Sequence, residues 1–191
     1  MYTNDKPEGK IDLRVRRTRK MLWEALLRLI ETRPFDSLTV QEICDEAMIH
    51  RTTFYKHFED KYHLISFGLG EIEDVFADIG YKERLFRPMK LFDGFRHTRQ
   101  FQALFKSASE NSVLGNMIMK HGYEKTRQDL LRAQQDGARF EEVPLDAAAA
   151  FYAGATTALC GWWMNSGMKA SAEEVDRYLN LMINRNLFMP E

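Results

Sequence analysis

Residues 39–58 constrain the fold of this chain most, because their pattern predicts two short helices joined by a tight turn. Thr39 suits the N-cap of the first helix, and Glu42, three residues later, completes a capping box. In the second helix, Phe54 and Phe58 lie four residues apart, so they share one face and can anchor the helix in a core. The sequence therefore predicts a helix-turn-helix motif.

Helical spacing of apolar residues continues through the rest of the chain, with little strand signal. Before the motif, residues 10–32 carry one apolar stripe, which Pro34 ends. We expect an all-α fold of about nine helices. It would comprise a disordered arm at 1–9, a three-helix head at 10–64 and a larger helical body at 65–191.

The composition is that of a globular protein, and its charges are balanced overall but unevenly distributed along the chain. The chain has 191 residues, 45% hydrophobic and 29% charged, with a formal net charge of −1. A basic cluster near the N-terminus is set against one acid, Asp12. Its members are Lys10, Arg14, Arg16, Arg17, Arg19 and Lys20. This cluster indicates either a local footprint for phosphate or a solvated helix end.

Several classes of site are not expected. Cys44 and Cys160 lie far apart among apolar neighbours, which favours small buried hydrophobes over a redox sensor, and neither has metal-ligand spacing. We expect no cofactor and no metal. The polar N-terminus lacks a secretory signal, and the uncharged residues 147–164 are rich in Ala, Gly and Thr, which favours a buried helix over a membrane span. We therefore expect a cytoplasmic protein with no membrane partner.

The polar side chains around the second helix of the motif suit double-stranded DNA. An Arg at the start of a recognition helix can bond a guanine, and Thr can offer a hydroxyl or a methyl group to a base. Tyr, His and Lys suit phosphate oxygens, and the N-terminus of the first helix offers backbone N–H groups to another phosphate. The predicted DNA-contacting residues are Thr39, His50, Arg51, Thr52, Thr53, Tyr55, Lys56, His57 and Lys61.

The run from Thr53 to Phe58, with Lys61 three residues later, resembles the N-terminal domain of TetR/AcrR-type transcriptional regulators over residues 14–67. The resemblance implies a DNA-binding head and a regulatory, dimerising body. It also implies a division of the DNA contacts. The phosphate-contacting positions would be Thr39, Thr53, Tyr55, His57 and Lys61, and the base-contacting or nearby positions Arg51, Thr52 and Lys56.

The turn of the motif departs from the family pattern. The family often has Ala-Gly-Val-Ser, whereas this chain has Ala47-Met-Ile-His50. Losing Gly removes the residue best suited to a positive φ, and losing Ser removes a strong N-cap. His50 is then either a partly exposed turn residue or a DNA contact.

Small residues three or four apart in the second-last helix would let another helix approach closely. In the family, the last two helices usually form a four-helix bundle with their twofold mates, so the resemblance implies a homodimer on a palindromic operator. An internal packing face would use the same residues. The predicted dimer-face residues are Ala150, Gly154, Ala158, Gly161, Tyr178, Leu179 and Met182.

The aromatic and Met-rich middle of the chain indicates either a cavity for an apolar ligand or a filled core. The family resemblance favours the cavity. The predicted ligand-binding residues are Phe92, Phe95, Phe101, Phe105, Met117, Tyr123 and Trp162.

These observations predict a DNA-binding transcriptional regulator, primarily a repressor, controlled by an unidentified small-molecule effector in the body. The alternative is control by a partner protein, because residues 153–174 weakly resemble the DhaS-like subgroup, whose type member answers to a protein. An enzyme is not expected, since the sequence has no metal motif, Gly-rich phosphate loop or nucleophile elbow. A helical adaptor that binds only protein is a third possibility. It would lack the steep salt dependence of DNA binding.

Overall fold

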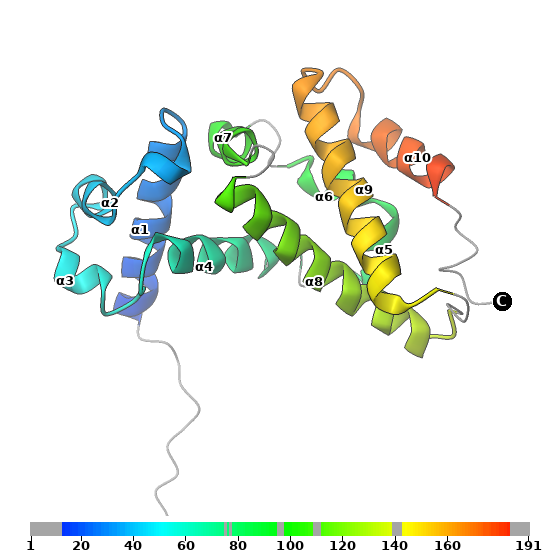
Figure 1. Cartoon of the computed structure of the whole chain (residues 1–191), viewed down its shortest axis with the longest axis horizontal. Helices are drawn as coiled ribbons and strands as arrows, with labels where there is room; N and C mark the ends of the chain where they lie inside the picture. The colour runs from blue at the N-terminus through cyan, green and yellow to red at the C-terminus, as the bar shows by residue number, and fades with distance from the viewer. Residues whose placement is uncertain are drawn as a thin grey trace, which may run out of the picture. The chain divides into compact units, whose positions relative to one another are not determined.

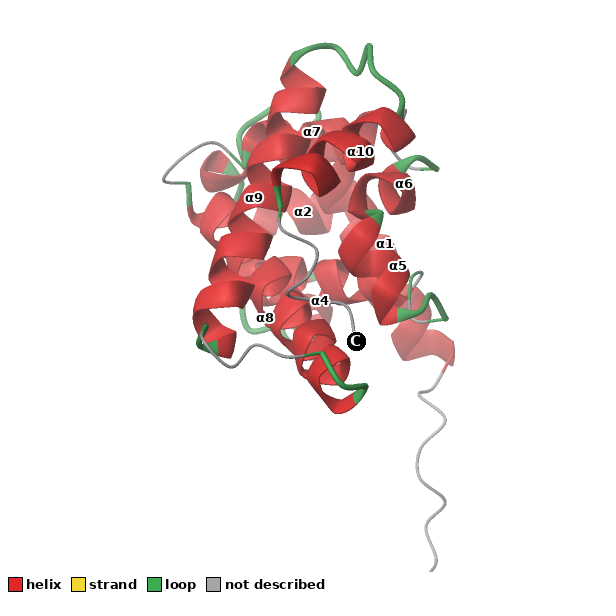
Figure 2. Cartoon of the chain, turned by 90° about the vertical axis from the view of Figure 1, so that its right-hand side faces the viewer, coloured by secondary structure: helices red, strands yellow, loops and turns green. Residues whose placement is uncertain are grey.

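The computed structural model contains α-helices and one 3-10 turn, with no strand among the residues that it describes (Figure 2). The predicted all-α fold is confirmed, and the predicted arm at 1–9 lies outside the described residues. These are residues 13–74, 76, 78–94, 98–108, 112–138 and 143–183. The elements are α1 (Leu13–Ile30), η1 (Phe35–Ser37), α2 (Val40–Ala47), α3 (Arg51–Phe54), α4 (Lys61–Asp74), α5 (Tyr81–Phe86), α6 (Pro88–Phe92), α7 (Arg99–Ser107), α8 (Val113–Gln135), α9 (Leu145–Asn165) and α10 (Ala172–Met182).

The chain divides into two compact units, Met1–Gly68 and Leu69–Glu191, which we call unit 1 and unit 2. The division falls inside α4, as does the boundary expected between residues 64 and 65. Figure 1 draws α1, α2 and α3 of unit 1 in blue to cyan, and α8, α9 and α10 of unit 2 in green to red.

The core of unit 1 forms where α1 packs against α2. One close approach requires a glycine, because a Cβ atom on Gly68 would lie 2.3 Å from the ring of Trp23. Phe54 and Phe58 are both buried, as their spacing predicted. The other fully buried large side chains of this unit are Leu22, Leu26, Phe35, Ile43, Leu64 and Ile65.

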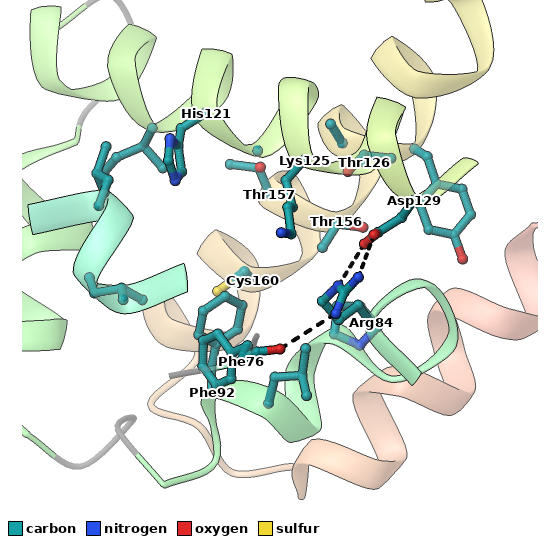
Figure 3. A pocket seen from close by; sticks show the side chains of 18 of the residues that line it. Phe76, Arg84, Phe92, His121, Lys125, Thr126, Asp129, Thr156, Thr157 and Cys160 are labelled. Atoms are coloured by element: carbon teal, nitrogen blue, oxygen red, sulfur yellow. Dashed lines mark hydrogen bonds and ion pairs between the residues drawn. The ribbon is translucent and has the colours of Figure 1, made fainter. Parts of the chain in front are cut away.

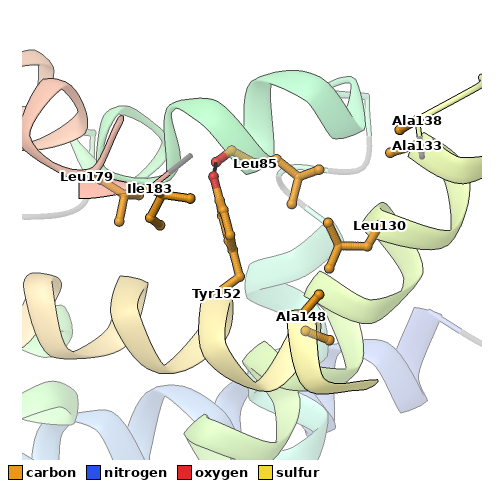
Figure 4. Close-up of a cluster of buried hydrophobic side chains, with 9 residues drawn as sticks. Leu85, Leu130, Ala133, Ala138, Ala148, Tyr152, Leu179 and Ile183 are labelled. Carbon is orange, nitrogen blue, oxygen red and sulfur yellow. Dashed lines mark hydrogen bonds between the residues drawn. The ribbon is translucent and has the colours of Figure 1, made fainter. Parts of the chain in front are cut away.

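In unit 2, α8 packs along α9, α5 packs against α8, and α10 packs against α6 and α9. Figure 4 shows the buried side chains that fill this arrangement, among them Leu85, Leu130, Tyr152 and Leu179. The Tyr152 hydroxyl donates to the backbone oxygen of Leu85 at 2.5 Å, so the one polar atom that this ring brings into the core is satisfied.

A buried carboxylate ties α10 to α6. Asp176 is buried and accepts hydrogen bonds from the backbone N–H groups of Met89 (2.8 Å) and Lys90 (3.0 Å). These groups belong to the first turn of α6, which has no helical partners for them. Burial raises the pKa of Asp176 to about 6, although both hydrogen bonds act to lower it.

Both thiols lie inside the protein. Cys44 and Cys160 are buried and free, and burial raises the pKa of each, that of Cys160 to about 12. A protonated, buried thiol is a poor nucleophile, as expected for a residue that acts as a small hydrophobe. In the part of the chain that the structure describes, no helix is both long and apolar enough to cross a membrane.

Candidate nucleic-acid interface and effector cavity

The capping box predicted for α2 is present. The Thr39 hydroxyl accepts from the Glu42 N–H at 3.2 Å, and the Glu42 carboxylate accepts from the Thr39 N–H at 2.8 Å. Arg33 pairs with the same carboxylate at 2.5 Å. The hydrogen bond from Arg33, followed by those from Thr39, lowers the pKa of Glu42 to about 2. These contacts fix where α2 begins.

Met48 makes the turn between α2 and α3 in the left-handed conformation, with φ 55° and ψ 41°. The Ile49 N–H donates to the Cys44 carbonyl at 2.9 Å, which closes α2 as a Schellman-type cap usually does. A glycine is normally found at such a position because a Cβ atom strains it. The turn therefore keeps its geometry without the family's glycine.

We expect Met48→Gly to raise the free energy of unfolding of unit 1 by about 0.5–1 kcal/mol, since glycine removes left-handed strain of about 1–2 kcal/mol but adds freedom to the unfolded chain. Met48 is 89% exposed, so little packing is lost. The measurement is urea denaturation followed by hydrogen exchange of α2 peptides. Met48→Ala is the control and should leave stability nearly unchanged, and an equal gain for both variants would contradict the strain argument.

The second helix of the motif is shorter than predicted. The sequence places both Phe54 and Phe58 in this helix, but α3 ends at Phe54 and the chain continues in tighter turns. Lys56 and His57 donate their N–H groups three residues back, at 3.2 and 2.9 Å, which is 3-10 geometry. His50 is exposed at the N-cap of α3 and makes no side-chain capping hydrogen bond, as expected from the loss of Ser.

The exposed face of α3 and of the turn that follows it carries four of the predicted DNA-contacting side chains: Arg51, Thr52, Tyr55 and Lys56. The Arg51 guanidinium donates to the Tyr55 hydroxyl at 3.2 Å and lies 5.7 Å from the centre of its ring. Phe54 meets that ring edge-on from the buried side. Tyr55 is thereby held between a core residue and an exposed cation.

The half-buried members of the predicted set are Thr53 and His57. Burial, followed by the nearby charges of Arg19 and Lys56, lowers the pKa of His57. A neutral His57 can still donate one hydrogen bond to a phosphate, without adding charge.

The basic cluster of α1 divides into two roles. Arg14, Arg16, Arg17 and Lys20 are exposed, so their charges face solvent. Arg19 is half-buried, with its guanidinium 5.8 Å from the Phe58 ring and 5.7 Å from the Phe67 ring. Lys10 lies outside the described residues.

Lys61, which the sequence predicts to contact a phosphate, has partners within unit 1. Its ammonium group donates to the backbone carbonyls of Phe35 (3.0 Å), Asp36 (2.9 Å) and Leu38 (2.8 Å). An ammonium has three donors, and these carbonyls take all of them. Burial lowers the pKa of Lys61. The residue therefore ties the start of α4 to η1.

Unit 2 contains a cavity of about 190 Å³ (Figure 3). Of the predicted ligand-binding residues, Phe92, Phe101 and Phe105 line it. Met117 and Tyr123 are not among its described lining residues, Trp162 is half exposed and lines a neighbouring groove, and Phe95 lies outside the described residues.

The polar part of the cavity wall was not anticipated. Arg84 on α5 and Asp129 on α8 form a two-bond ion pair of 2.8 and 2.5 Å, with side chains only 8% and 3% exposed. Arg84 also donates to the backbone oxygens of Ile79 and Phe76. Forty-five positions separate the two charged residues. The signal for this ion pair in the sequence was Asp129, an acidic residue beside the apolar positions of α8.

The predicted dimer-face residues are mostly accessible. Ala150, Ala158 and Met182 are exposed, and Gly154, Gly161 and Tyr178 are half-buried. Leu179 is a correction, because it is 1% exposed and packs into the core of unit 2. Two large exposed side chains were missed, Phe151 (65% exposed) and Leu181 (74%).

Comparison with known proteins identifies relatives of both the helix-turn-helix head and the helical body. The family model "Transcriptional regulator C-terminal region" matches residues 89–185, and "Bacterial regulatory proteins, tetR family" matches residues 22–66. The "Uncharacterized HTH-type transcriptional regulator YxbF" of Bacillus subtilis (strain 168) is 26% identical over 180 residues, which cover 86% of this chain. The match spans 44% of that relative's length.

Two solved structures share the fold at low sequence identity. A TetR transcriptional regulator from Streptococcus agalactiae 2603V superposes with a TM-score of 0.62 at 21% identity, covering 91% of this chain and 97% of that one. The dihydroxyacetone kinase operon activator DhaS superposes with a TM-score of 0.58 at 16% identity, covering 86% and 93%. The matched head and body together show that this chain belongs to the TetR family of bacterial transcriptional regulators.

Proposed function

We propose that this regulator is a repressor that binds a palindromic operator as a homodimer and releases it when an effector fills the cavity of unit 2. The observation that carries the proposal is the exposed, cationic and hydroxyl-bearing face of residues 51–56, which Phe54 and Phe58 anchor from the buried side. Such a face presents donors and acceptors to base edges and phosphates without disturbing the core beneath it.

The side chains on this face divide by what they can recognise. Arg51 stands at the first position of α3, where a guanidinium reaches base edges, so it carries sequence preference. Tyr55 offers a hydroxyl already oriented by Arg51, which suits a phosphate oxygen. Removing the Arg51 side chain should therefore change which DNA sequence is preferred, and removing the Tyr55 side chain should weaken binding to every sequence.

We expect Tyr55→Ala to weaken binding about tenfold or more on all duplexes, and Arg51→Ala to change the preferred sequence by about 1–3 kcal/mol at one base pair. The measurement is a gel-shift titration on duplexes selected from a random pool, repeated at several salt concentrations. Lys120→Met, at an exposed lysine of α8, is the control. Equal affinity of the Tyr55 variant and the parent would refute the phosphate role, and no salt-dependent duplex binding would refute the function.

The proposed dimer face lies on α9 and α10. Phe151 and Trp162 on α9, with Leu181 and Met182 on α10, are between 50% and 74% exposed. Large apolar side chains exposed around small residues mark a surface that a partner covers. A second copy is the fitting partner, because a twofold dimer would supply two recognition helices for a palindrome.

We expect Gly154→Glu to convert the dimer to a monomer, because a charge buried between two copies has no partner. A Cβ atom on Gly154 meets nothing within 4 Å in the protomer, and Glu favours the helix more than Gly does, so the fold should be retained. Sedimentation measures the mass, and Gln128→Glu on α8 controls for the added charge. An intact Gly154→Glu dimer would rule out this face.

A further inference from the structure

We propose that Arg19 of α1 and His57, in the turns that follow α3, together bind one phosphate of the operator, with Arg19 supplying the charge and His57 a neutral hydrogen-bond donor. This inference rests on the proposed function, because it adds a site to the same DNA interface. Its basis is a cation that unit 1 holds against two aromatic rings without giving it an acceptor.

The two rings fix the position of the Arg19 guanidinium. Its Cζ atom lies 5.8 Å from the centre of the Phe58 ring and 5.7 Å from that of the Phe67 ring, and the two ring centres are 5.5 Å apart. Phe58 is buried and Phe67 belongs to α4, so α1, the turns after α3 and α4 all meet at this point. A planar guanidinium that is already packed in this way loses less freedom when it binds an anion.

The same guanidinium has no acceptor within the described part of unit 1. The Nε atom of Arg19 is buried without a hydrogen-bond partner, and none of the ion pairs among the described residues includes Arg19. Two other cations of this chain differ, because Arg84 reaches a carboxylate and Lys61 reaches three backbone carbonyls. A cation that serves only the fold is expected to have such partners. The missing acceptor therefore points to a ligand with negatively charged oxygens.

His57 lies beside this cation. It directly precedes Phe58, and burial, followed by the charges of Arg19 and Lys56, lowers its pKa. At about pH 8 the imidazole is therefore neutral and has one N–H to donate. Tyr55, the proposed phosphate contact, is two residues earlier, so the pair formed by Arg19 and His57 adjoins the surface already proposed to meet DNA.

A backbone phosphate of a duplex suits these two groups. Its non-bridging oxygens share one negative charge and both accept hydrogen bonds, so the guanidinium and the imidazole can bind the same phosphate. Arg19 is only half-buried, which leaves it open to such a ligand. Phosphate contacts position a protein on DNA without reading the sequence. Removing Arg19 or His57 should therefore weaken binding to all duplexes alike.

The main test measures duplex binding of Arg19→Met by gel shift at about pH 8 and several salt concentrations. In a dimer, the decrease of log affinity with log salt should become shallower by about 2, and binding at the lowest salt should weaken at least about tenfold. Met keeps an apolar stem over the two rings, which favours folding. Arg19→Lys keeps the charge but not the planar fork, so it should keep the parent slope and bind more weakly than the parent.

His57→Phe separates the neutral donor from the charge. This variant should bind every duplex at least about threefold more weakly with the salt slope unchanged, because a neutral imidazole releases no counterion. If both side chains hold one phosphate, combining Arg19→Met with His57→Phe should cost less affinity than the product of the two single losses. Losses that multiply would show two independent contacts and overturn the shared site.

Arg87→Met is the matched control, since it makes the same substitution at an arginine of unit 2 whose side chain is 55% exposed. It should keep the parent affinity and slope. Circular dichroism checks that each variant is folded, and Arg19→Gln replaces Arg19→Met if the latter is not.

The inference is overturned if the folded Arg19 variant keeps the parent slope, or if His57→Phe binds as tightly as the parent. Either result, with a parent that binds duplexes, leaves the proposed function standing. A parent without salt-dependent duplex binding refutes the proposed function and this site together.

Discussion

Replacing Arg84 by Met is expected to lower the free energy of unfolding of unit 2 by about 3–5 kcal/mol, because breaking a buried ion pair leaves a carboxylate in the interior with only the exposed Arg132, 3.9 Å away, to compensate its charge. Asp129 would keep its carboxylate with 3% of its side chain exposed and lose both hydrogen bonds from Arg84. The backbone oxygens of Ile79 and Phe76 would also lose a donor. Hydrogen-exchange mass spectrometry of α8 peptides, titrated with urea, measures this loss in unit 2 alone.

Two further variants test the explanation. Arg87→Met removes an arginine that is 55% exposed and pairs with Glu83 only at 3.5 Å, so it should cost no more than about 0.5 kcal/mol. Arg84→Met combined with Asp129→Leu removes both charges and should recover most of the stability, as apolar replacements of buried pairs often do. The mechanism is wrong if the double variant is as unstable as the sum of the single ones.

The parts of the fold that were predictable from the sequence depend on short-range rules. The capping box of Thr39 and Glu42 is a three-residue pattern, and the shared face of Phe54 and Phe58 follows from helical spacing. The exposed polar face of residues 51–56 was predictable for the same reason, because two buried anchors four residues apart leave the other side chains of the segment facing outward.

The unpredicted parts depend on contacts between distant positions. Lys61 meets carbonyls more than twenty residues earlier, and Arg84 meets Asp129 forty-five residues later, so neither pair leaves a local pattern. Leu179 carried the spacing of an apolar stripe, but spacing alone does not say whether the stripe faces its own core or another copy. The early end of α3 comes from 3-10 bonds at Lys56 and His57, a change that terminal turns often make.

Lys56 and Lys61 are only five residues apart, but their Met variants should affect different properties: Lys56→Met the salt dependence of DNA binding, and Lys61→Met the free energy of unfolding. Lys56 is exposed, so Lys56→Met should leave the free energy of unfolding within about 0.5 kcal/mol of the parent. If each Lys56 neutralises one phosphate, a dimer loses two phosphate contacts. The decrease of log affinity with log salt should then become shallower by about 2, since each phosphate contact contributes about 0.9 to the slope. Gel shifts at several salt concentrations give this slope.

Lys61→Met should instead lower the free energy of unfolding of unit 1 by about 2 kcal/mol, because three backbone carbonyls lose a charged donor and some of them regain water. Hydrogen exchange of peptides spanning residues 31–47 measures the loss. The salt slope of operator binding should stay at the parent value at temperatures where the variant is folded, because the ammonium remains on the carbonyls when DNA binds. A slope reduced as far as that of Lys56→Met, with stability unchanged, would show that Lys61 leaves the carbonyls to contact a phosphate.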